Sequence, residues 1–485
     1  MYKMKNIQST VFIVISIILI VFILFFRLGE AALALWDESR LAVNAFEMLK
    51  NGNFFISYFD GSPDMWNTKP GLLIFLQAVS MKIFGISEFA VRLPSVLSAL
   101  ALCFLIIWST KRFYKTIVPG IFASLILVSS YGFIYAHGAR SADYDALFVL
   151  LTTAMSLFFY LAIMGEALSI KFLYISALFF FLAFMTKSVQ ALLFFLPIFA
   201  FVIYKRKLKF LFKNIHFYIA AFLSIGLIFF YYFLREQINP GYIDAVIKNE
   251  AGRFFNVYEG HSGGYFFYLA NLFSERFFPW IILFALALII FLKFCAAFTA
   301  ERKNSFQFFL FIIVFYFVQI SVSETKLEWY DLPLYPLFSI FIAFVFYSFY
   351  LEFREKIKRK FMLLFSIGFI SAFCLTYSYL ILKIYMQKEN QLPYAAFIKS
   401  EHAPKKYTVA NNYFFNDKNN HSHILFYKLM MQEKGFDISV KHSQQLLPGE
   451  IVLVCEEAVM NDIKMNYNFD LIERSDDCFL IKIKD

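Results

Sequence analysis

Ionisable side chains in this 485-residue chain collect where its hydrophobic segments end. When those segments are read as membrane spans, ten such residues fall at the same membrane face. They are Asp37, Glu38, Lys69, Arg140, Asp143, Asp145, Lys187, Arg253, Lys326 and Tyr330. Ionisable groups at membrane depth are costly to bury and usually functional. Carboxylates and cations gathered at one face predict an active site for a lipid-linked anionic substrate.

The carboxylates come as two pairs. Asp37 and Glu38 open a predicted outer helix, where an acidic pair could simply complement the helix dipole. Near the bilayer face a carboxylate can also act as a general base, because partial desolvation raises its pKa. Asp143 and Asp145 are two residues apart and point in nearly opposite directions on a helix, so we expect only one to face a shared cavity.

The cations Lys69, Lys187, Arg253 and Lys326 come from four separate outer segments. Any one of them alone could be a snorkelling interfacial side chain. Four cations on the face that positive charge usually avoids point instead to an anion. Charge-assisted donors of this kind bind phosphate or pyrophosphate, and Arg can do so in bidentate fashion.

Composition predicts an all-α polytopic membrane protein. The chain is 60% hydrophobic, 21% aromatic and 16% charged, whereas soluble domains average about 25% charged residues. Apolar runs of about 18 residues or more recur, each long enough to cross a bilayer. About eleven spans are predicted, near residues 10–28, 88–109, 117–136, 144–164, 167–186, 188–204, 216–234, 267–293, 305–322, 331–350 and 361–383.

Basic loops set the predicted orientation, because Lys and Arg mark the cytoplasmic ends of spans. Five basic segments alternate onto one side of the membrane: Lys3 with Lys5, 111–115, 205–213, 302–303 and 354–360. The N-terminus is therefore expected in the cytoplasm, after which the first apolar run is a retained anchor. This alternation requires 167–204 to be a hairpin of two spans. The net charge of +10 then reflects topology and contact with anionic lipid rather than nucleic acid.

Two regions stand outside the predicted spans. In the loop 29–87, polar residues at 37, 40, 44 and 47 alternate with an apolar stripe, which predicts an amphipathic helix at the membrane interface ending near Gly52. A turn at 60–64 and a second helix from Pro70 to Phe84 should follow. Hydropathy falls again in the tail. We therefore predict a transmembrane domain at 1–390 and a small outer α/β domain at 391–485.

The tail pattern predicts strands at 407–410, 436–440, 450–454 and 479–483, with helices at 423–433 and 458–467. Cys455 ends one strand-like run and Cys478 starts another. Because both lie on the predicted oxidising side, they could form a disulfide, or they could be two buried free thiols. Cys103, Cys295 and Cys374 lie in spans and are expected to be packing residues.

Several soluble chemistries have no motif here, since GxGxxG, GxxxxGK[ST], GxSxG and metal-type Cys/His spacings are missing. Other fragments, in order, resemble the GT-C glycosyltransferases of the protein O-mannosyltransferase and aminoarabinose (lipid A) transferase branch over about residues 10–350. They are Asp37-Glu38-Ser39-Arg40 (DE-x-R), Thr68-Lys69-Pro70 (EKP), Ser87 to Ser95 (SEFAxRLPS), Arg140 with Asp145-Ala146-Leu147, Thr186-Lys187, Glu250 to Arg253, and Lys326 to Pro336.

This resemblance implies inverting transfer of a sugar from a polyprenyl (undecaprenyl) phosphate donor to a hydroxyl acceptor, such as lipid A, another glycan or a protein. Asp37 would be the base, with Glu38 as second candidate and Asp145 as supporting carboxylate. Lys69, Arg253 and Tyr330 would hold the donor phosphate, assisted by Lys187 and Lys326. A monomer in a bacterial inner membrane is expected, with the site at the outer face.

Two departures from the family concern metal binding. Thr68 stands where the EKP motif has glutamate, and Ala251 stands where the aminoarabinose enzymes have histidine after glutamate. We therefore expect no metal or other cofactor. Three alternatives remain open at this stage: a ligase using lipid-pyrophosphate glycans, a transporter of an anionic lipid or solute, and a non-catalytic scaffold. A transporter should show broken helices or repeat symmetry near the midplane, and the sequence predicts neither.

Overall fold

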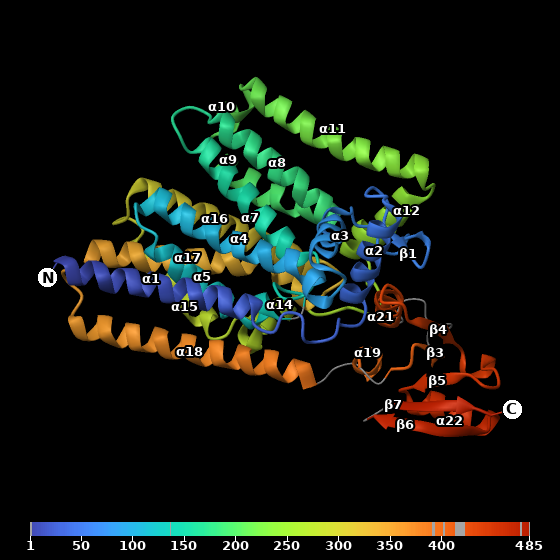
Figure 1. The fold of residues 1–485 in the computed structure, drawn as a ribbon. Coiled ribbons are helices and arrows are strands. Elements are labelled where there is room, and N and C mark those ends of the chain that lie inside the picture. The colour runs from blue at the N-terminus through green and yellow to red at the C-terminus, as the bar shows by residue number, and fades with distance from the viewer. Residues whose placement is uncertain are drawn as a thin grey trace. The chain divides into compact units, whose positions relative to one another are not determined.

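The computed structural model describes residues 2–135, 137–389, 393–400, 403–412, 422–475 and 478–484 (Figure 1). It divides into two compact units that interleave along the chain. The first contains residues 1–26, 65–73 and 94–382. The second contains residues 27–64, 74–93 and 383–485. The predicted domain limits of 1–390 and 391–485 stay a prediction.

The first unit is a bundle of apolar helices. Its elements are α1 (Tyr2–Phe25), most of α4 (Glu88–Tyr114), α5 (Val118–Val128), α6 (Tyr131–Ile134), α7 (Asp145–Ile163), α8 (Ile170–Lys187), η1 (Ser188–Phe194), α9 (Phe195–Tyr204), α10 (Leu208–Phe212), α11 (Ile215–Ile238), α12 (Tyr242–Val246), η2 (Ile247–Ala251), α13 (Gly252–Phe255), α14 (Phe267–Asn271), η3 (Leu272–Arg276), α15 (Trp280–Phe294), α16 (Ala300–Val322), η4 (Glu328–Asp331), α17 (Leu334–Phe353) and most of α18 (Arg359–Glu389). Helix α17 packs against α5, α15 and α16, and α7 packs against α8.

Long apolar helices confirm the predicted membrane class. Among the described residues, seven helical segments are long and apolar enough to cross a membrane, or eight if one bent pair counts as a span. This is fewer than the eleven predicted spans, although each predicted span contains helix within the described residues. Thr10–Phe25 and Val118–Val128 are shorter apolar helices, and Ile170–Tyr204, one of the seven segments, comprises α8, η1 and α9.

The segment Ile170–Tyr204 is a hairpin, as the alternation of basic loops requires. Ser188, where α8 ends, has a positive φ of 52°, and the chain reverses there. The rings of Phe180 in α8 and Phe195 in α9 lie 4.7 Å apart. After α9, the Lys207 ammonium donates to the carbonyl of Gly165, in the loop that precedes α8, at 3.1 Å. The two ends of the stretch are therefore close together.

The span predicted as one helix over 267–293 is broken, so the expectation of unbroken helices is wrong. Its two halves, Phe267–Arg276 and Trp280–Phe294, meet at 118°. Ser274 leaves helical geometry at ψ −115°, and Pro279 cannot donate an N–H to the preceding turn. Arg276 at the bend is held by Asp331, with 3.1 Å between guanidinium and carboxylate.

In the second unit, α2 (Asp37–Asn51) ends where predicted, with Gly52 in the left-handed conformation at φ 65°. Its polar face does not lie open at an interface as the amphipathic pattern suggested. The Arg40 guanidinium binds Asp64 in bidentate fashion at 2.8 and 2.9 Å, and Asn44 donates to the same carboxylate at 3.0 Å. Asp64 follows the hairpin β1 (Tyr58–Phe59) and β2 (Ser62–Pro63). α3 (Leu72–Phe84) comes next.

The rest of the second unit is the predicted α/β fold. A five-stranded sheet has the order β4-β3-β5-β7-β6, in which β3 is parallel to β4 and β5, and β7 is antiparallel to β5 and β6. Its elements are α19 (Pro393–Ile398), β3 (Lys406–Ala410), α21 (Ser422–Gln432), β4 (Asp437–Lys441), η5 (Ser443–Gln445), β5 (Ile451–Val454), α22 (Glu457–Asn466), β6 (Phe469–Ser475) and β7 (Cys478–Ile483). Sequence reasoning missed β6, a largely exposed edge strand, and the short helices α19 and η5.

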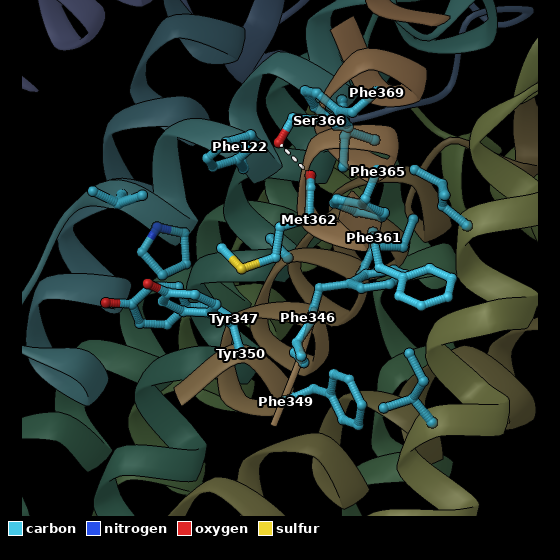
Figure 2. A pocket seen from close by; sticks show the side chains of 18 residues that line it. Phe122, Phe346, Tyr347, Phe349, Tyr350, Phe361, Met362, Phe365, Ser366 and Phe369 are labelled. Carbon is cyan, nitrogen blue, oxygen red and sulfur yellow. Dashed lines mark hydrogen bonds between the residues drawn. The ribbon is translucent and has the colours of Figure 1, made fainter. Parts of the chain in front are cut away.

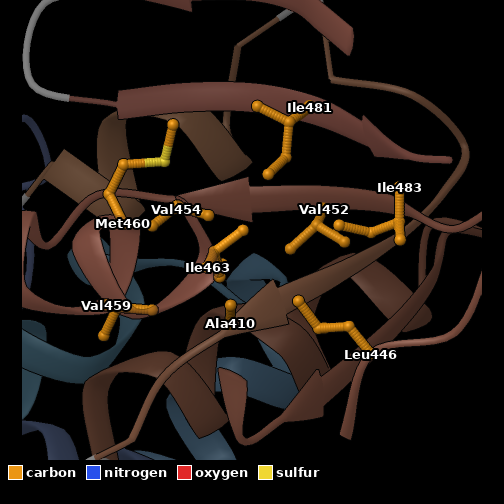
Figure 3. Close-up of a cluster of buried hydrophobic side chains, with 9 residues drawn as sticks. All are labelled: Ala410, Leu446, Val452, Val454, Val459, Met460, Ile463, Ile481 and Ile483. Carbon is orange, nitrogen blue, oxygen red and sulfur yellow. The ribbon is translucent and has the colours of Figure 1, made fainter. Parts of the chain in front are cut away.

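Apolar side chains from β5, β7 and α22 form the core of this sheet (Figure 3). Val452, Val454, Ile463 and Ile481 are each fully buried. At the edge of this core Cys455 and Cys478 form a disulfide, with their Cα atoms 4.0 Å apart. Of the two possibilities left open by the sequence, the bridge is confirmed.

Removing this disulfide should lower stability. The bridge closes a loop with a sequence separation of 23 residues, and loops of this size restrict the unfolded chain by about 3 kcal/mol. We expect Cys455→Ser/Cys478→Ser to unfold at lower temperature than Cys103→Ser, the control. In the unfolded, unreduced wild-type protein, thiol labelling should reach Cys103, Cys295 and Cys374 only. Labelling at 455 or 478 would contradict the bridge.

Candidate functional site

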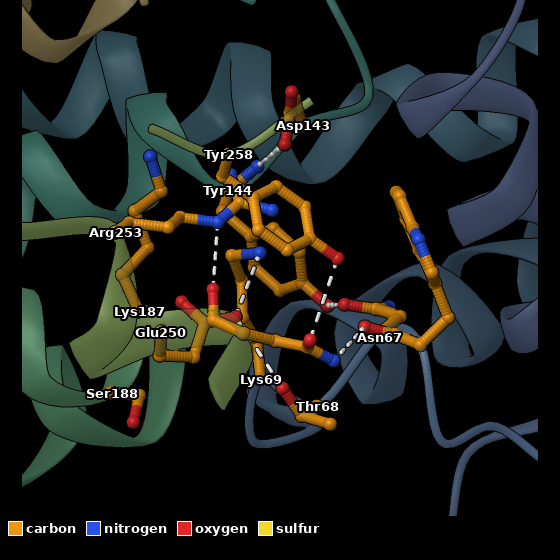
Figure 4. A network of polar contacts seen from close by, with 12 residues as sticks. Asn67, Thr68, Lys69, Asp143, Tyr144, Lys187, Ser188, Glu250, Arg253 and Tyr258 are labelled. Carbon is orange, nitrogen blue, oxygen red and sulfur yellow. Dashed lines mark hydrogen bonds and ion pairs between the residues drawn. The ribbon is translucent and has the colours of Figure 1, made fainter. Parts of the chain in front are cut away.

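Within the first unit, Lys69 and Thr68 converge on the carboxylate of Glu250 (Figure 4). The Lys69 ammonium lies 3.2 Å from Glu250 Oε1, and the Thr68 hydroxyl donates to the same oxygen at 3.5 Å. The Glu250 side chain is 1% exposed and that of Lys69 is 18% exposed. Glu250 Oε2 is buried and has no hydrogen-bond partner among the described residues.

Backbone geometry brings these residues together from distant parts of the chain. Glu250 lies in η2, a turn of π-helix, a form that is rare and frequent at functional sites. The segment carrying Thr68 is held from two sides. The Tyr242 hydroxyl donates to the Thr68 carbonyl at 2.8 Å, and Asn67 donates to the Tyr144 hydroxyl at 3.0 Å.

Arg253 and Tyr330 share a cavity of about 200 Å³ with Glu250. The guanidinium of Arg253 donates to the Tyr330 hydroxyl at 3.4 Å and to the Asn249 carbonyl at 2.6 Å. It also lies 4.5 Å from the centre of the Tyr258 ring. Burial raises the pKa of the Tyr258 hydroxyl, so it stays a neutral donor here.

Lys187 and Asp145 form a buried ion pair beside this cavity. Their charged atoms are 2.7 Å apart, and the side chains are 4% and 2% exposed. The Lys187 ammonium lies 5.8 Å from the centre of the Tyr330 ring. Asp145 Oδ2 has no hydrogen-bond partner in the described part of the chain. Five residues predicted from the sequence are thus connected. Glu250 contacts Lys69 and shares its cavity with Arg253 and Tyr330, and Tyr330 lies beside the Lys187–Asp145 pair.

Asp143 faces a different partner from Asp145, as two positions on one helical turn predict. It pairs with the ring nitrogen Nδ1 of His137, and its Oδ1 accepts from the Tyr144 N–H at 2.6 Å. The His137 ring stacks on Trp329 with centroids 3.5 Å apart. Burial alone raises the pKa of Asp143, but the charge and hydrogen bond of His137 outweigh it and lower that pKa to about 2.

Two other predicted cations support backbone carbonyls. The Lys326 ammonium binds the carbonyls of Ser321 and Ser323, where α16 ends, and it is buried. Burial lowers its pKa, against the opposing charge of Glu324. The Arg140 guanidinium caps α1, donating to the carbonyls of residues 23, 24 and 26 at 2.7–2.9 Å. A role for Lys326 in donor binding stays a prediction.

A larger cavity of about 430 Å³ lies between α5, α15, α17 and α18 (Figure 2). Its walls are aromatic and aliphatic, with Phe122, Phe346 and Phe369 among them, and no charged side chain lines it in the described residues. The Ser366 hydroxyl is satisfied by its own helix, donating to the Met362 carbonyl at 2.9 Å. This cavity has no cation to bind a phosphate among its described lining residues, so the smaller, charged cavity is the candidate site.

Asp37 and Glu38 belong to the second unit. Asp37 is half-exposed at the start of α2. Glu38 is buried in a bidentate ion pair with Arg92, with both side chains 4% exposed. Its Oε1 and Oε2 accept from Arg92 at 2.8 and 2.9 Å, and Oε2 accepts from the Ala34 N–H at 2.6 Å. Glu38 is therefore held in a buried structural ion pair, and its role as a second base candidate stays a prediction. That Asp37 lines one cavity with Asp145 and Lys69 stays a prediction.

Sequence reasoning missed Glu250 as the centre of the cluster. It was noted only as part of the segment that ends in Arg253, because its π-helical turn has no sequence signature. A signal was nevertheless present, since Glu250 and Arg253 are three residues apart and so lie on one helix face. The supporting tyrosines Tyr242 and Tyr258 were also missed, as tyrosine is common throughout this chain.

Comparisons with known proteins place this chain beside glycosyltransferases. The family described as dolichyl-phosphate-mannose-protein mannosyltransferase matches residues 68–233. An uncharacterised protein of Aquifex aeolicus is 29% identical over 332 residues, which are 66% of this chain and 70% of that protein. The undecaprenyl phosphate-alpha-4-amino-4-deoxy-L-arabinose arabinosyl transferase of Yersinia pestis is 29% identical over 154 residues, 31% of this chain and 27% of that protein.

Among solved structures, ArnT from Cupriavidus metallidurans bound to undecaprenyl phosphate has a TM-score of 0.70. The match covers 98% of each chain at 14% identity. The chain therefore has the GT-C fold of that protein. Together with the family match, this fold supports a glycosyltransferase that depends on a lipid-phosphate sugar.

Loss of the Lys69 charge should weaken donor binding. We choose Lys69→Met with Glu250→Gln, because removing the cation alone would leave a buried, unpaired carboxylate. Losing one charge-assisted hydrogen bond of about 1.5–3 kcal/mol should raise the donor KM by roughly 10-fold or more. Steady-state kinetics with undecaprenyl-phosphate sugars would measure this. Lys207→Met, which removes a cation held by the Gly165 carbonyl, is the control and should leave KM unchanged; equal KM increases in both variants would refute the assignment.

Glu38→Gln should destabilise the fold rather than slow the chemistry. The substitution leaves the Arg92 guanidinium buried without its counter-charge, and breaking a buried pair costs about 3–5 kcal/mol. We expect a clear drop in the unfolding temperature, measured in detergent, whereas Asp37→Asn should unfold like the wild type. A Glu38→Gln protein of wild-type stability without activity would restore Glu38 as a catalytic candidate.

Proposed function

We propose that this protein is an inverting glycosyltransferase. It moves a monosaccharide from an undecaprenyl or related polyprenyl phosphate to a hydroxyl acceptor, which could be lipid A, another glycan or a protein. One observation carries the proposal. In a fold shared with a protein crystallised with undecaprenyl phosphate, Arg253 and Tyr330 line a cavity together with the buried Glu250, and Lys69 is paired with that Glu250.

The charge of the cluster suits a phosphodiester. Three cations, Lys69, Lys187 and Arg253, face two carboxylates, Glu250 and Asp145, within the paired contacts described above. One positive charge is left over, and a phosphate that links a sugar to a polyprenol carries one negative charge. Among the described residues the Lys69 ammonium has one carboxylate partner, Glu250, which leaves two of its three protons for a ligand. A pyrophosphate carries more charge than the cluster neutralises, which disfavours the ligase alternative.

The proposed reaction is a single displacement at the anomeric carbon. The acceptor oxygen attacks the anomeric carbon from the face opposite the phosphate, while the bond from that carbon to the phosphate oxygen breaks. Asp37 accepts the acceptor proton as general base. The polyprenyl phosphate leaves with additional negative charge, which Arg253 and Lys69 stabilise more strongly than the ground state. Tyr330, hydrogen-bonded to Arg253, can donate to the same phosphate.

No metal or other cofactor is required in this proposal. The Thr68 hydroxyl occupies the EKP glutamate position and donates to Glu250, so it adds a neutral donor where the family offers an anionic ligand. Ala251 likewise brings no imidazole. We further propose a monomer in a bacterial inner membrane, with the N-terminus in the cytoplasm and the site and C-terminal sheet at the outer face. The basic loops at one set of helix ends support this orientation.

A deletion strain tests the proposal most directly. Mass spectrometry of its envelope glycolipids and glycoproteins should show one species reduced in mass by a single sugar, with the polyprenyl-phosphate sugar accumulating. Loss of a whole lipid-pyrophosphate glycan would instead favour the ligase. If every envelope glycan kept its mass and only the location of an anionic lipid or solute changed, the transporter would be favoured and the proposal overturned.

Asp37→Asn should remove the base while nearly preserving shape. We expect turnover to fall by about 10²-fold or more, as is usual when a general base is lost, with donor binding largely kept. The assay is release of undecaprenyl phosphate from undecaprenyl-phosphate sugars by purified protein. Asp60→Asn, an exposed carboxylate in the same unit, is the matched control. Near wild-type turnover by the Asp37 variant would reject this residue as the base.

A further inference from the structure

The C-terminal helix α21 packs against α2, the helix that begins with the proposed base Asp37. Both helices belong to the second unit, although nearly the whole membrane domain separates them in sequence. Ser422 and Tyr427 of α21 are fully buried, and their polar atoms reach the turn that leads into α2. The C-terminal domain is thus part of the surroundings of Asp37.

This turn needs outside support. Trp36, directly before Asp37, has φ 68° and ψ −116°, and no side chain caps the helix at this position. A positive φ in a bulky residue costs about 1–3 kcal/mol and persists only where neighbouring contacts enforce it. Trp36 is itself 42% exposed, so its own packing does not supply that enforcement.

Two hydroxyl groups of α21 supply contacts on either side of Trp36. The Tyr427 hydroxyl accepts from the Leu33 N–H at 2.9 Å and donates to Glu88 Oε1 at 3.0 Å. The Ser422 hydroxyl lies 2.6 Å from that of Ser39. Ser39 in turn donates to the Trp36 carbonyl at 3.2 Å. The turn is therefore tied to α21 before and after the strained residue.

Glu88 connects the same contact to the membrane helix that carries Arg92. Its carboxylate accepts from Tyr427 and lies 2.5 Å from the ammonium of Lys399, another residue of the C-terminal domain. One helical turn later, Arg92 holds Glu38 and the carbonyls of residues 28, 31 and 32. α21 and the first turn of α4 thus hold the chain around Asp37 together.

We propose that Tyr427 and Ser422 are positioning residues for the reaction, which fix the direction of the Asp37 carboxylate through the Trp36 turn. The proposal rests on Asp37 as the base under the proposed function. It gives the C-terminal domain a role in turnover that nothing in its strand pattern indicates. In this proposal neither residue touches substrate, and both act by holding the segment between Leu33 and Ser39.

Full-length Tyr427→Phe and Ser422→Ala test this role. A displacement of about 1 Å at a catalytic group can cost up to 10²-fold, so we expect kcat for release of undecaprenyl phosphate to fall about 10-fold or more, with the donor KM within about 2-fold. Tyr407→Phe is the matched control. This tyrosine is buried in the same domain, and its hydroxyl has no partner within the described ranges.

Coupling to Asp37 separates positioning from general stability. In an Asp37→Asn background, adding Tyr427→Phe should produce no further loss of kcat, because the group being positioned has gone. Unfolding temperatures recorded for every variant show whether assays were made on folded protein. Equal kcat for Tyr427→Phe and Tyr407→Phe, or full additivity with Asp37→Asn, would overturn the inference. If instead Asp37→Asn itself keeps activity, the base assignment in the proposed function fails first.

Discussion

The buried pair of Glu38 and Arg92 is the contact on which the outer loop depends. A guanidinium at 4% exposure is tolerated only when its donors are satisfied. Arg92 meets this requirement with both carboxylate oxygens of Glu38 and three backbone carbonyls. Those five bonds fix the chain between α1 and α2. Asp37 is adjacent to Glu38, so the Glu38–Arg92 pair also constrains the backbone that carries the Asp37 side chain.

The same constraint shapes the charged cluster of the first unit. Lys69 pairs with Glu250 and Lys187 pairs with Asp145, so these buried charges are compensated before any substrate binds. Each carboxylate keeps one buried oxygen without a partner among the described residues. Such a site is polar and preorganised, and its donors need little rearrangement to meet a phosphate. Compensation therefore stabilises the cluster, and its surplus positive charge is what the proposed anionic donor would meet.

Residues in the family-like motifs divide into two kinds once their contacts are known. Lys69, Arg253 and Tyr330 lie around Glu250, where a phosphate could be bound. Three other charged residues come from equally recognisable motifs but have structural partners. Arg40 binds Asp64, whereas Glu38 and Arg92 pair with each other and Arg92 also binds the loop between α1 and α2. Arg140 caps α1. Motif recognition alone does not separate the two kinds, because a buried structural pair and a binding site require the same charged residue types.

Hydropathy, charge alternation and strand patterning determined the membrane class, the hairpin at 167–204, most of the C-terminal sheet and the charged residues at helix ends. These properties depend on local composition, and each segment carries its own signal. Tertiary structure alone decided that 267–293 bends, that Glu250 lies on a π-helical turn, and that Cys455 bonds Cys478. It also decided that α21 packs on α2 across almost 400 residues of sequence. Such contacts form because buried polar groups must find partners wherever the fold brings them, and that choice is not written in any one segment.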